Sequence, residues 1–189
     1  MRTIAAKHNE RAETSMGSWM ADAMRDATGA DVATCNRQYY RGIPLTKGQD
    51  VYLIDLFNWL RPCIRCLSTF EITGEGLLKI IEDNVRNSKK EDVFLLQVSG
   101  CRYEFDRRRP KGERIVQSDI EPERKYTVVC EGHVLSRGDM CFLAGRFGKI
   151  PHKDLEITNI SAAWRYIHKC GGRIEGRLDG RVQEIKAHN

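Results

Sequence analysis

The sequence lacks any long apolar run. No stretch approaches the roughly 18 consecutive apolar residues that a membrane-spanning helix needs. The first residues, MRTIAAKHNERAE, turn polar too early for the apolar region of a secretory signal. Internal repeats and low-complexity segments are absent as well. We therefore expect a folded chain with no membrane partner.

The composition indicates a globular protein of modest size. Hydrophobic residues make up 41% of the 189 residues and charged residues 30%, which is enough to bury a core and excludes a disordered tail. The length is that of one large domain or two small ones and is short for a two-domain enzyme. We predict a single domain over residues 1–189, with a core at about 5–170 and a basic C-terminal tail at 171–189.

The positive charge gathers in two places. The formal net charge is +5, and basic residues cluster at 107–111 and again in the tail, at Arg173, Arg177 and Arg181. Such clusters can bind phosphate or nucleic acid. No DNA- or RNA-binding motif accompanies them, so we favour solvated turns and expect no nucleic-acid partner.

The seven cysteines are an odd number, so at least one thiol stays free. This favours a reducing compartment and points weakly to the cytoplasm, although the signal of an exported parent would precede this chain. Cys63 and Cys66 form a CxxC pair, for which Cys130 with His133 is the only conceivable second pair of zinc ligands. We favour the interpretation of these cysteines as small apolar strand residues.

Hydrophobic periodicity predicts the fold class. Apolar residues three or four apart predict a helix that begins after Thr14 or Ser15 and stops at Gly29. Further helices are predicted at 49–60, 75–87 and 159–170, and strands at 31–36, 64–72, 94–98, 101–106, 114–120 and 126–130. Helices that come first, then strands, then a last helix indicate a single α+β domain with a mixed β-sheet rather than a regular βαβ repeat.

A set of short phrases, in this order, resembles one family. They are Arg11-Ala12-Glu13-Thr14-Ser15-Met16-Gly17, Asn36 to Arg41, Leu60-Arg61-Pro62, Glu71-Ile72-Thr73-Gly74, Val98-Ser99-Gly100, Gly112-Glu113-Arg114-Ile115, Tyr126-Thr127-Val128 and Gly138-Asp139. The ordered set is similar to the C-terminal, substrate-binding domain of the 5'-nucleotidase family, which includes UDP-sugar hydrolases and cyclic-nucleotide phosphodiesterases. The resemblance covers about residues 5–170.

The resemblance implies a division of labour. An N-terminal metallophosphoesterase domain, the expected partner of this chain in a longer protein, holds two divalent metal ions and the catalytic residues. The C-terminal domain binds the nucleotide and presents it to those metals. This chain carries only five scattered histidines, and its His8-Asn9-Glu10 has the wrong order for a motif of the metal domain. We expect no catalytic residue, no metal and no cofactor in this chain.

The resemblance also assigns binding residues. The family's Asn-Gly-Gly-Gly-Ile-Arg loop corresponds to residues 36–41, so Asn36 would lie near the base and Arg41 near the phosphates. The three glycines are replaced by Arg37, Gln38 and Tyr39. The positive charge of Arg37 would favour an anionic ligand. The rings of Tyr39 and Tyr40 would either stack on a base or pack into the loop.

Other positions of the resemblance are altered. The two base-stacking rings correspond to Cys63 and His133, and a cysteine cannot stack. Asp139 matches the aspartate of a Gly-Gly-Asp-Gly turn whose first and last glycines are here Arg137 and Met140. Arg11 resembles a phosphate-binding arginine, with a structural ion pair as the alternative.

Three functions stay open on the sequence alone. We favour the nucleotide-binding domain of a 5'-nucleotidase-type metallophosphohydrolase in nucleotide catabolism. The alternative is a non-enzymatic binding or assembly module that retains the fold but has lost the pocket. A basic nucleic-acid-binding domain ranks third.

Overall fold

The structure, a computed structural model, describes residues 13–35, 48, 50–59, 66–85, 96–132 and 150–185. In chain order its elements are α1 (Ser15–Thr28), β1 (Val32–Cys35), α2 (Leu53–Trp59), β2 (Cys66–Thr73), α3 (Gly74–Asn84), β3 (Gln97–Ser99), β4 (Tyr103–Phe105), β5 (Ile115–Ser118), β6 (Lys125–Glu131), β7 (His152–Thr158), α6 (Asn159–Lys169) and β8 (Val182–Glu184). Across the described residues, no helix has the length and apolar character to cross a membrane.

The strands form two sheets. A five-stranded sheet has the order β3-β1-β6-β2-β7, and a three-stranded sheet has the order β5-β4-β8. β1 runs parallel to β6 and β4 parallel to β8, while the other neighbouring strands are antiparallel. Helices and mixed sheets pack together, so the predicted α+β fold class is confirmed.

Helix α1 begins and ends where the pattern predicts. The Thr14 hydroxyl accepts a hydrogen bond from the Gly17 N–H, and Gly29 ends the helix at φ 68°, in the left-handed region. Its apolar residues are buried, among them Met16, Trp19, Met20, Ala23 and Met24. α1 therefore covers the sheet with one continuous apolar face.

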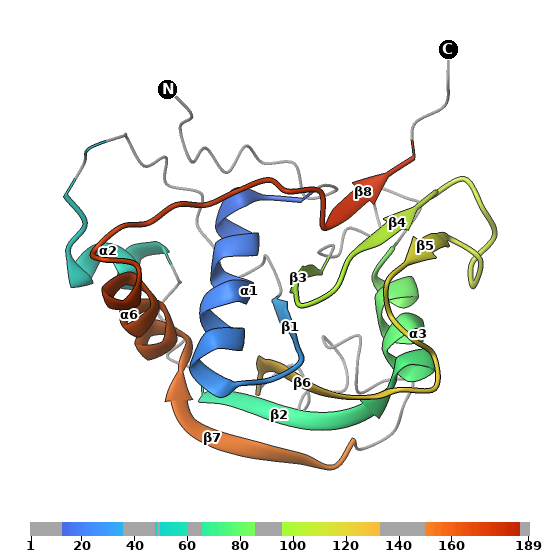
Figure 1. Ribbon diagram of the computed structural model, residues 1–189, viewed down its shortest axis with the longest axis horizontal. Helices are drawn as coiled ribbons and strands as arrows, with labels where there is room; N and C mark the ends of the chain where they lie inside the picture. Colours follow the sequence, from blue (N-terminus) through green and yellow to red (C-terminus); the bar gives the residue numbers. More distant parts are fainter. Residues whose placement is uncertain are drawn as a thin grey trace.

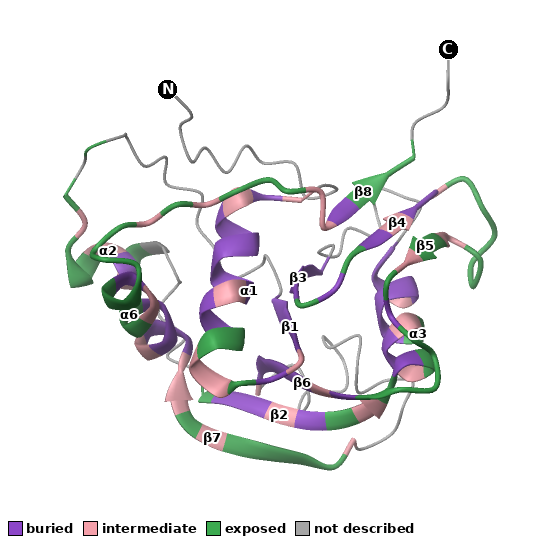
Figure 2. Cartoon of the chain, viewed as in Figure 1, coloured by how far each residue is buried: buried purple, intermediate pink, exposed green. Residues whose placement is uncertain are grey.

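The central strands β1 and β6 of the five-stranded sheet are buried on both faces. Because successive strand residues point to opposite sides, Val32 and Val128 join one apolar cluster while Ala33 and Val129 join the other. Helices α1 and α6 pack on one face, and α3 with the small sheet packs on the other (Figure 1). Figure 2 shows β1 and β6 as buried over most of their length.

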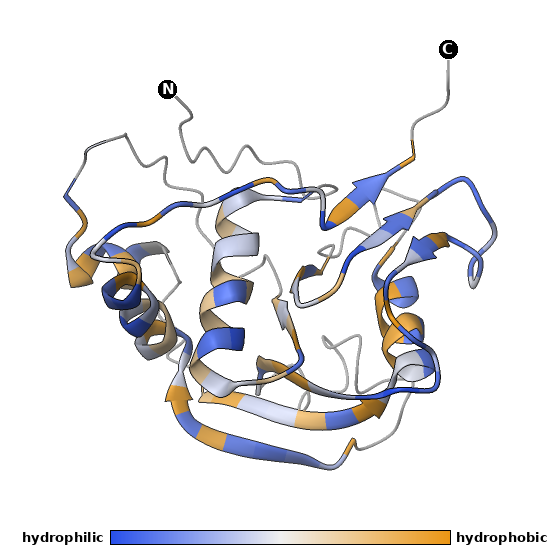
Figure 3. Cartoon of the chain, viewed as in Figure 1, coloured by the Kyte–Doolittle hydropathy of each residue, from blue (hydrophilic) through white to orange (hydrophobic). Residues whose placement is uncertain are grey.

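Two strands were not predicted. β7 pairs with β2 at the edge of the large sheet, where it is mostly exposed and mostly hydrophilic (Figures 2 and 3). β8 lies inside the segment that we expected to be a basic tail. Instead, residues 171–185 cross the start of α1 and end beside β4 (Figure 1). Val182 is buried, and a Cβ on Gly176 would lie 2.7 Å from the Ser15 carbonyl oxygen, so this segment is part of the fold.

The basic clusters are paired with carboxylates rather than simply solvated. The Arg107 side chain is only 11% exposed, lies over the Phe105 ring and contacts Glu184 at 3.0 Å. Arg108 contacts Asp106 at 2.7 Å and, through its hydrogen bonds, lowers the pKa of that carboxyl to about 2. These pairs reduce the positive charge that the 107–111 cluster presents to a polyanion.

Candidate binding site

One end of the large sheet brings together the ends of the described strands next to which the predicted binding residues follow in the sequence. The register pairs Cys35 at the end of β1 with Gln97 at the start of β3. β1 is parallel to β6, and its partners Val32↔Val128 and Ala33↔Val129 place the end of β6 beside the end of β1. Glu131, the last residue of β6, pairs in turn with Leu67 of β2. We call the row of Gln97, Cys35, Glu131 and Leu67 the β1–β6 end.

The start of α1 lies at the same end. The backbone N–H of Thr14 donates to the Gln97 side-chain oxygen at 2.7 Å, and the Thr14 hydroxyl donates to the same atom at 3.3 Å. Gln97 is fully buried and packs so closely on Gly17 that a Cβ there would lie 2.4 Å from its Cγ. This contact fixes the chain that enters α1 against the β1–β6 end.

The seven predicted binding residues lie outside the described part of the chain. They are Arg11, Asn36, Arg37, Tyr39, Arg41, His133 and Asp139. Their chain neighbours are described: Asn36 follows Cys35, His133 follows Gly132, and Arg11 precedes Glu13 by two residues. Cys35, the last residue of β1, and Gly132, directly after β6, are therefore the described positions that lie nearest in the chain to Asn36 and His133.

A buried carboxylate at this end escaped the sequence analysis. Glu131 is 1% exposed, although it ends an apolar strand directly before Gly132. The packing beside it is tight: a Cβ on Gly132 would lie 2.5 Å from the Ser68 hydroxyl oxygen, and Ser68 itself donates to Asp154. The sequence did carry a signal for this buried carboxylate, namely a charged residue at the end of an apolar strand, directly before a glycine.

Of the two described cysteines in the conceivable zinc set, one is a buried apolar strand residue as we expected and the other is not. Cys130 packs in the apolar cluster on the α3 face, and Cys66 at the start of β2 is exposed with a free thiol. Cys63 and His133, the other members of the conceivable zinc set, lie outside the described residues. Within the described ranges no group of three His, Cys, Asp or Glu side chains could hold a metal ion.

Thiol reactivity should follow burial. Burial first, and then the nearby Asp119, raises the pKa of Cys101 to about 12, so its thiolate is scarce at pH 8. Cys66 and Cys170 are exposed. Brief iodoacetamide treatment of the folded chain at pH 8, followed by peptide mass spectrometry, should label Cys66 and Cys170 and leave Cys101 unmodified until urea is added. Early labelling of Cys101 would contradict the packing of β3 and β4.

Comparison with known proteins identifies the family. The family model described as 5'-nucleotidase, C-terminal domain, matches residues 1–144. No curated protein matches the chain significantly. A solved 5'-nucleotidase precursor from Thermus thermophilus has a TM-score of 0.80 at 22% identity over 95% of this chain and 37% of its own.

Two further solved structures share the fold. The NAD nucleotidase of Haemophilus influenzae has a TM-score of 0.74 at 18% identity, covering 92% of this chain and 33% of its own. A sulfate thiohydrolase from Thermus thermophilus has a TM-score of 0.70 at 17% identity, covering 94% of this chain and 33% of its own. The chain thus spans little more than a third of the length of these relatives.

The family match covers well over half of the chain, and the fold agrees with it. The chain belongs to the 5'-nucleotidase C-terminal domain family.

Proposed function

We propose that this chain is the substrate-binding domain of a 5'-nucleotidase-type phosphohydrolase in nucleotide catabolism, and that it binds a nucleotide or a related phosphate ester at the β1–β6 end. The observation that carries the proposal is the parallel pairing of β1 with β6. In open α/β sheets, ligands bind outside the carboxyl ends of parallel strands. Here those two ends lead directly into Asn36 and His133.

Each binding residue has a role in this proposal. Asn36 contacts the base, while Arg41 and Arg11 contact the phosphates, since a guanidinium can bind two phosphate oxygens at once. Arg37 adds positive charge beside them. The Tyr39 or His133 ring, or both, stacks on the base, and Asp139 accepts a hydrogen bond from the ligand.

The altered positions predict weak nucleotide binding or an unusual ligand. A stacked base is worth about 1–3 kcal/mol per aromatic ring. Cysteine at position 63 removes one such ring, which lowers nucleotide affinity about 5- to 150-fold unless Tyr39 compensates. The substrate is therefore selected by phosphate contacts more than by base stacking.

Hydrolysis belongs, in this proposal, to a metallophosphoesterase domain of a longer protein. The solved relatives are between about two and a half and three times as long as this chain, and two of them are nucleotidases. Two divalent metal ions in that domain would activate water and stabilise the phosphoryl group. The described residues of this chain form no ligand set for such ions, so no bond-breaking step is assigned to them.

The experiment is a calorimetric titration at low salt with AMP, UDP-glucose, a cyclic nucleotide and inorganic phosphate. We expect at least one to bind with Kd between about 1 μM and 1 mM. The double variant Asn36→Ala, Arg41→Ala should lose at least tenfold in affinity. Arg165→Ala is the matched control, because Arg165 is exposed on α6 and should leave affinity unchanged.

Two results would contradict the proposal. One is the absence of heat with every ligand for a chain shown to be folded by circular dichroism. The other is equal affinity in the double variant and in Arg165→Ala, which would place binding elsewhere on the molecule.

Exposed apolar side chains on α2 favour a second candidate, an assembly module. Tyr52 is 65% exposed, Ile54 is 62% exposed and Leu53 is 44% exposed, on consecutive residues at the start of α2. Large exposed apolar patches mark protein interaction sites. If the chain binds no nucleotide and sedimentation velocity shows an oligomer that Ile54→Lys dissociates, this second candidate replaces the first.

A further inference from the structure

Gln97 is a fully buried amide in an otherwise apolar stretch. It begins β3, and the residues on either side of it are Leu96 and Val98. A buried amide costs free energy unless hydrogen bonds satisfy it, and an apolar side chain could fill the same place in a strand without that cost. The presence of Gln97 therefore calls for a reason other than the packing of the sheet.

The hydrogen bonds of Gln97 hold the chain just before α1. Its side-chain oxygen accepts the backbone N–H of Thr14 at 2.7 Å and the Thr14 hydroxyl at 3.3 Å. The helix is capped without this contact, because the hydroxyl and carbonyl oxygens of Thr14 accept the N–H groups of Gly17 and Ser18. The bond to Gln97 thus fixes the entry of the chain rather than the helix itself.

The residue before Thr14 is held as well. One carboxylate oxygen of Glu13 accepts the Ser18 hydroxyl at 3.1 Å and the backbone N–H of Asp179 at 3.3 Å. Two consecutive residues at the entry of α1 therefore have hydrogen bonds to residues 83 and 166 positions further along the chain. Arg11, which we assign to the phosphates, precedes Glu13 by two residues in the sequence.

Gln97 also belongs to the β1–β6 end. The antiparallel register pairs it with Cys35, and Asn36 comes next in the sequence. One side chain thus links the entry of α1, which follows Arg11, to the last residue of β1. Groups that bind a ligand do so well only when packing and hydrogen bonds around them fix their positions. Packing fixes Gln97 itself, since a Cβ on Gly17 would lie 2.4 Å from its Cγ.

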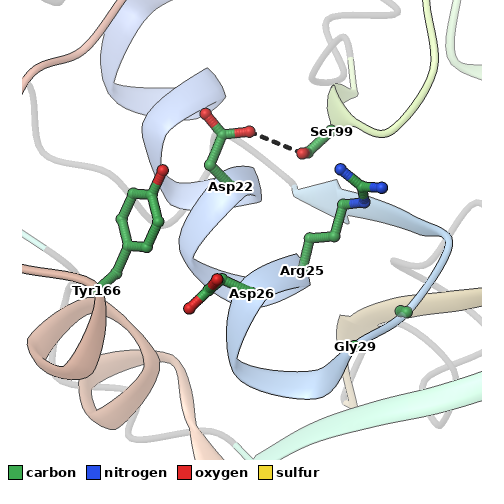
Figure 4. Close-up of a pocket in the computed structure, with 7 residues that line it drawn as sticks. Asp22, Arg25, Asp26, Gly29, Ser99 and Tyr166 are labelled. Atoms are coloured by element: carbon green, nitrogen blue, oxygen red, sulfur yellow. Dashed lines mark hydrogen bonds between the residues drawn. The ribbon is translucent and has the colours of Figure 1, made fainter. Parts of the chain in front are cut away.

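The other end of β3 offers a comparison. Ser99, the last residue of β3, is buried and donates to Asp22 of α1 at 2.7 Å (Figure 4). Asp22 is eight residues beyond Thr14 (22 minus 14), which is about 12 Å along the helix. β3 is therefore joined to α1 at both ends, and the contact of Gln97 is the one at the β1–β6 end.

We infer that Gln97 is a positioning residue of the nucleotide site, which by holding Thr14 sets the position from which Arg11 binds the phosphates. The inference rests on the proposed function and adds to it a residue that is assigned no ligand contact. Without the Gln97 oxygen, the Thr14 N–H loses its acceptor while the cap of α1 remains. The loss then falls on phosphate binding more than on the fold.

The test is a double-variant cycle on ligand affinity. The probe is the tightest-binding of AMP, UDP-glucose, a cyclic nucleotide and inorganic phosphate, all of which carry phosphate. Gln97→Met keeps the side-chain length and removes the amide oxygen, and Arg11→Ala removes the guanidinium. We expect each to weaken binding at least about tenfold. The double variant should bind within about twofold of Arg11→Ala alone, because a residue that acts through Arg11 has no effect once Arg11 is gone.

A second variant reaches the same contact from the helix. Gly17→Ala places a methyl group 2.4 Å from the Gln97 Cγ, so the amide must move, while alanine favours the helix more than glycine does. We expect it to weaken binding of the probe about fivefold or more. Ser99→Ala is the matched control, because it removes the contact of β3 with Asp22 and should leave the affinity unchanged.

The unaltered chain gives a further measurement. In NMR spectra, the backbone amide signal of Thr14 and the side-chain amide signals of Gln97 should shift in step with binding of the probe. The inference is wrong, and the proposed function stands, if the probe binds without these shifts. The same holds if Gln97→Met and Gly17→Ala bind as tightly as Ser99→Ala, or if the losses from Gln97→Met and Arg11→Ala multiply. If none of the four ligands binds the folded parent chain, the proposed function and this inference are both wrong.

Discussion

Replacing Glu82 by alanine is expected to lower the free energy of unfolding by about 3–4 kcal/mol. Glu82 lies in α3 and is 9% exposed. Its Oε1 accepts hydrogen bonds from the backbone N–H groups of Gly112 and Arg114 at 2.9 Å and 3.1 Å, and its Oε2 accepts from the Ile115 N–H at 2.8 Å. One carboxylate thus satisfies three backbone donors of the turn that enters β5.

The expected loss of stability follows from the three backbone N–H groups that the substitution leaves without an acceptor. Hydrogen bonds to a charged group contribute about 1.5–3 kcal/mol each, and an unpaired buried donor costs about 1–3 kcal/mol. Part of this cost is recovered because water can reach the turn, which is exposed at residues 110–113. We therefore expect less than the sum of three full losses.

The measurement is urea unfolding followed by circular dichroism, with two comparison variants. Glu82→Gln keeps the shape but turns one acceptor into a donor, so it should cost about 1–2 kcal/mol. Glu75→Ala is the matched control, because Glu75 is on the same helix, exposed and paired only with Lys79, and it should change stability by less than about 1 kcal/mol. Equal effects of Glu82→Ala and Glu75→Ala would show that the turn does not depend on this carboxylate.

The helices were predictable because their signals are local. In α1 the apolar spacing, the Thr14 cap and the Gly29 stop all lie within 16 consecutive residues. α6 likewise begins at Thr158, whose side chain caps the Ser161 N–H. Such elements form largely from contacts between near neighbours in the chain, so a single sequence carries enough information to locate them.

β7 and β8 were not predictable in the same way. β7 reads His-Lys-Asp-Leu-Glu-Ile-Thr and exposes most of its side chains, because it is an edge strand with little apolar surface to bury. β8 has a single buried residue, Val182, and depends on pairing with β4, some 80 residues earlier. These two strands form because they pair with a neighbouring strand. Their own alternation of apolar and polar residues is too short to predict a strand from the sequence.

The candidate site was predictable only through the family resemblance. Asn36 and His133 are 97 positions apart (133 minus 36), and nothing in periodicity brings them together. The parallel register of β1 and β6 places the ends of the two strands that precede them side by side. The burial of Glu131 was missed because it is a product of packing across elements rather than of a local pattern.

Replacing Arg181 by methionine is expected to lower the free energy of unfolding by about 2–3 kcal/mol. Its guanidinium is 13% exposed and binds Asp22 through two parallel hydrogen bonds and Asp179 through Nε at 2.8 Å. Breaking a buried ion pair by removing one partner costs about 3–5 kcal/mol, because the other charge stays buried. Asp22 is 26% exposed, so water relieves part of this cost.

The Asp22–Arg181 ion pair also joins residues 171–185 to α1. The prediction can therefore be checked by a second measurement. Hydrogen exchange should accelerate at Tyr103 and Ile185, whose N–H groups donate to the Arg181 and Phe105 carbonyl oxygens across the β4–β8 pair. Arg177→Met is the matched control, because Arg177 lies in the same segment but is 76% exposed and pairs only with Glu175, so its effect should stay below about 0.5 kcal/mol.

A double-mutant cycle tests the coupling directly. If the ion pair is the source of the effect, the double variant Asp22→Asn, Arg181→Met should lose less unfolding free energy than the sum of the two single variants. The difference should be at least about 1 kcal/mol, because the double variant leaves neither charge of this pair without its partner. Additive single effects would instead mean that Arg181 stabilises the segment through its contacts with Asp179 and with the Ser18 and Val98 carbonyl oxygens. In either case the expected loss of stability makes the C-terminal segment, which the sequence analysis placed outside the core, a structural part of the domain.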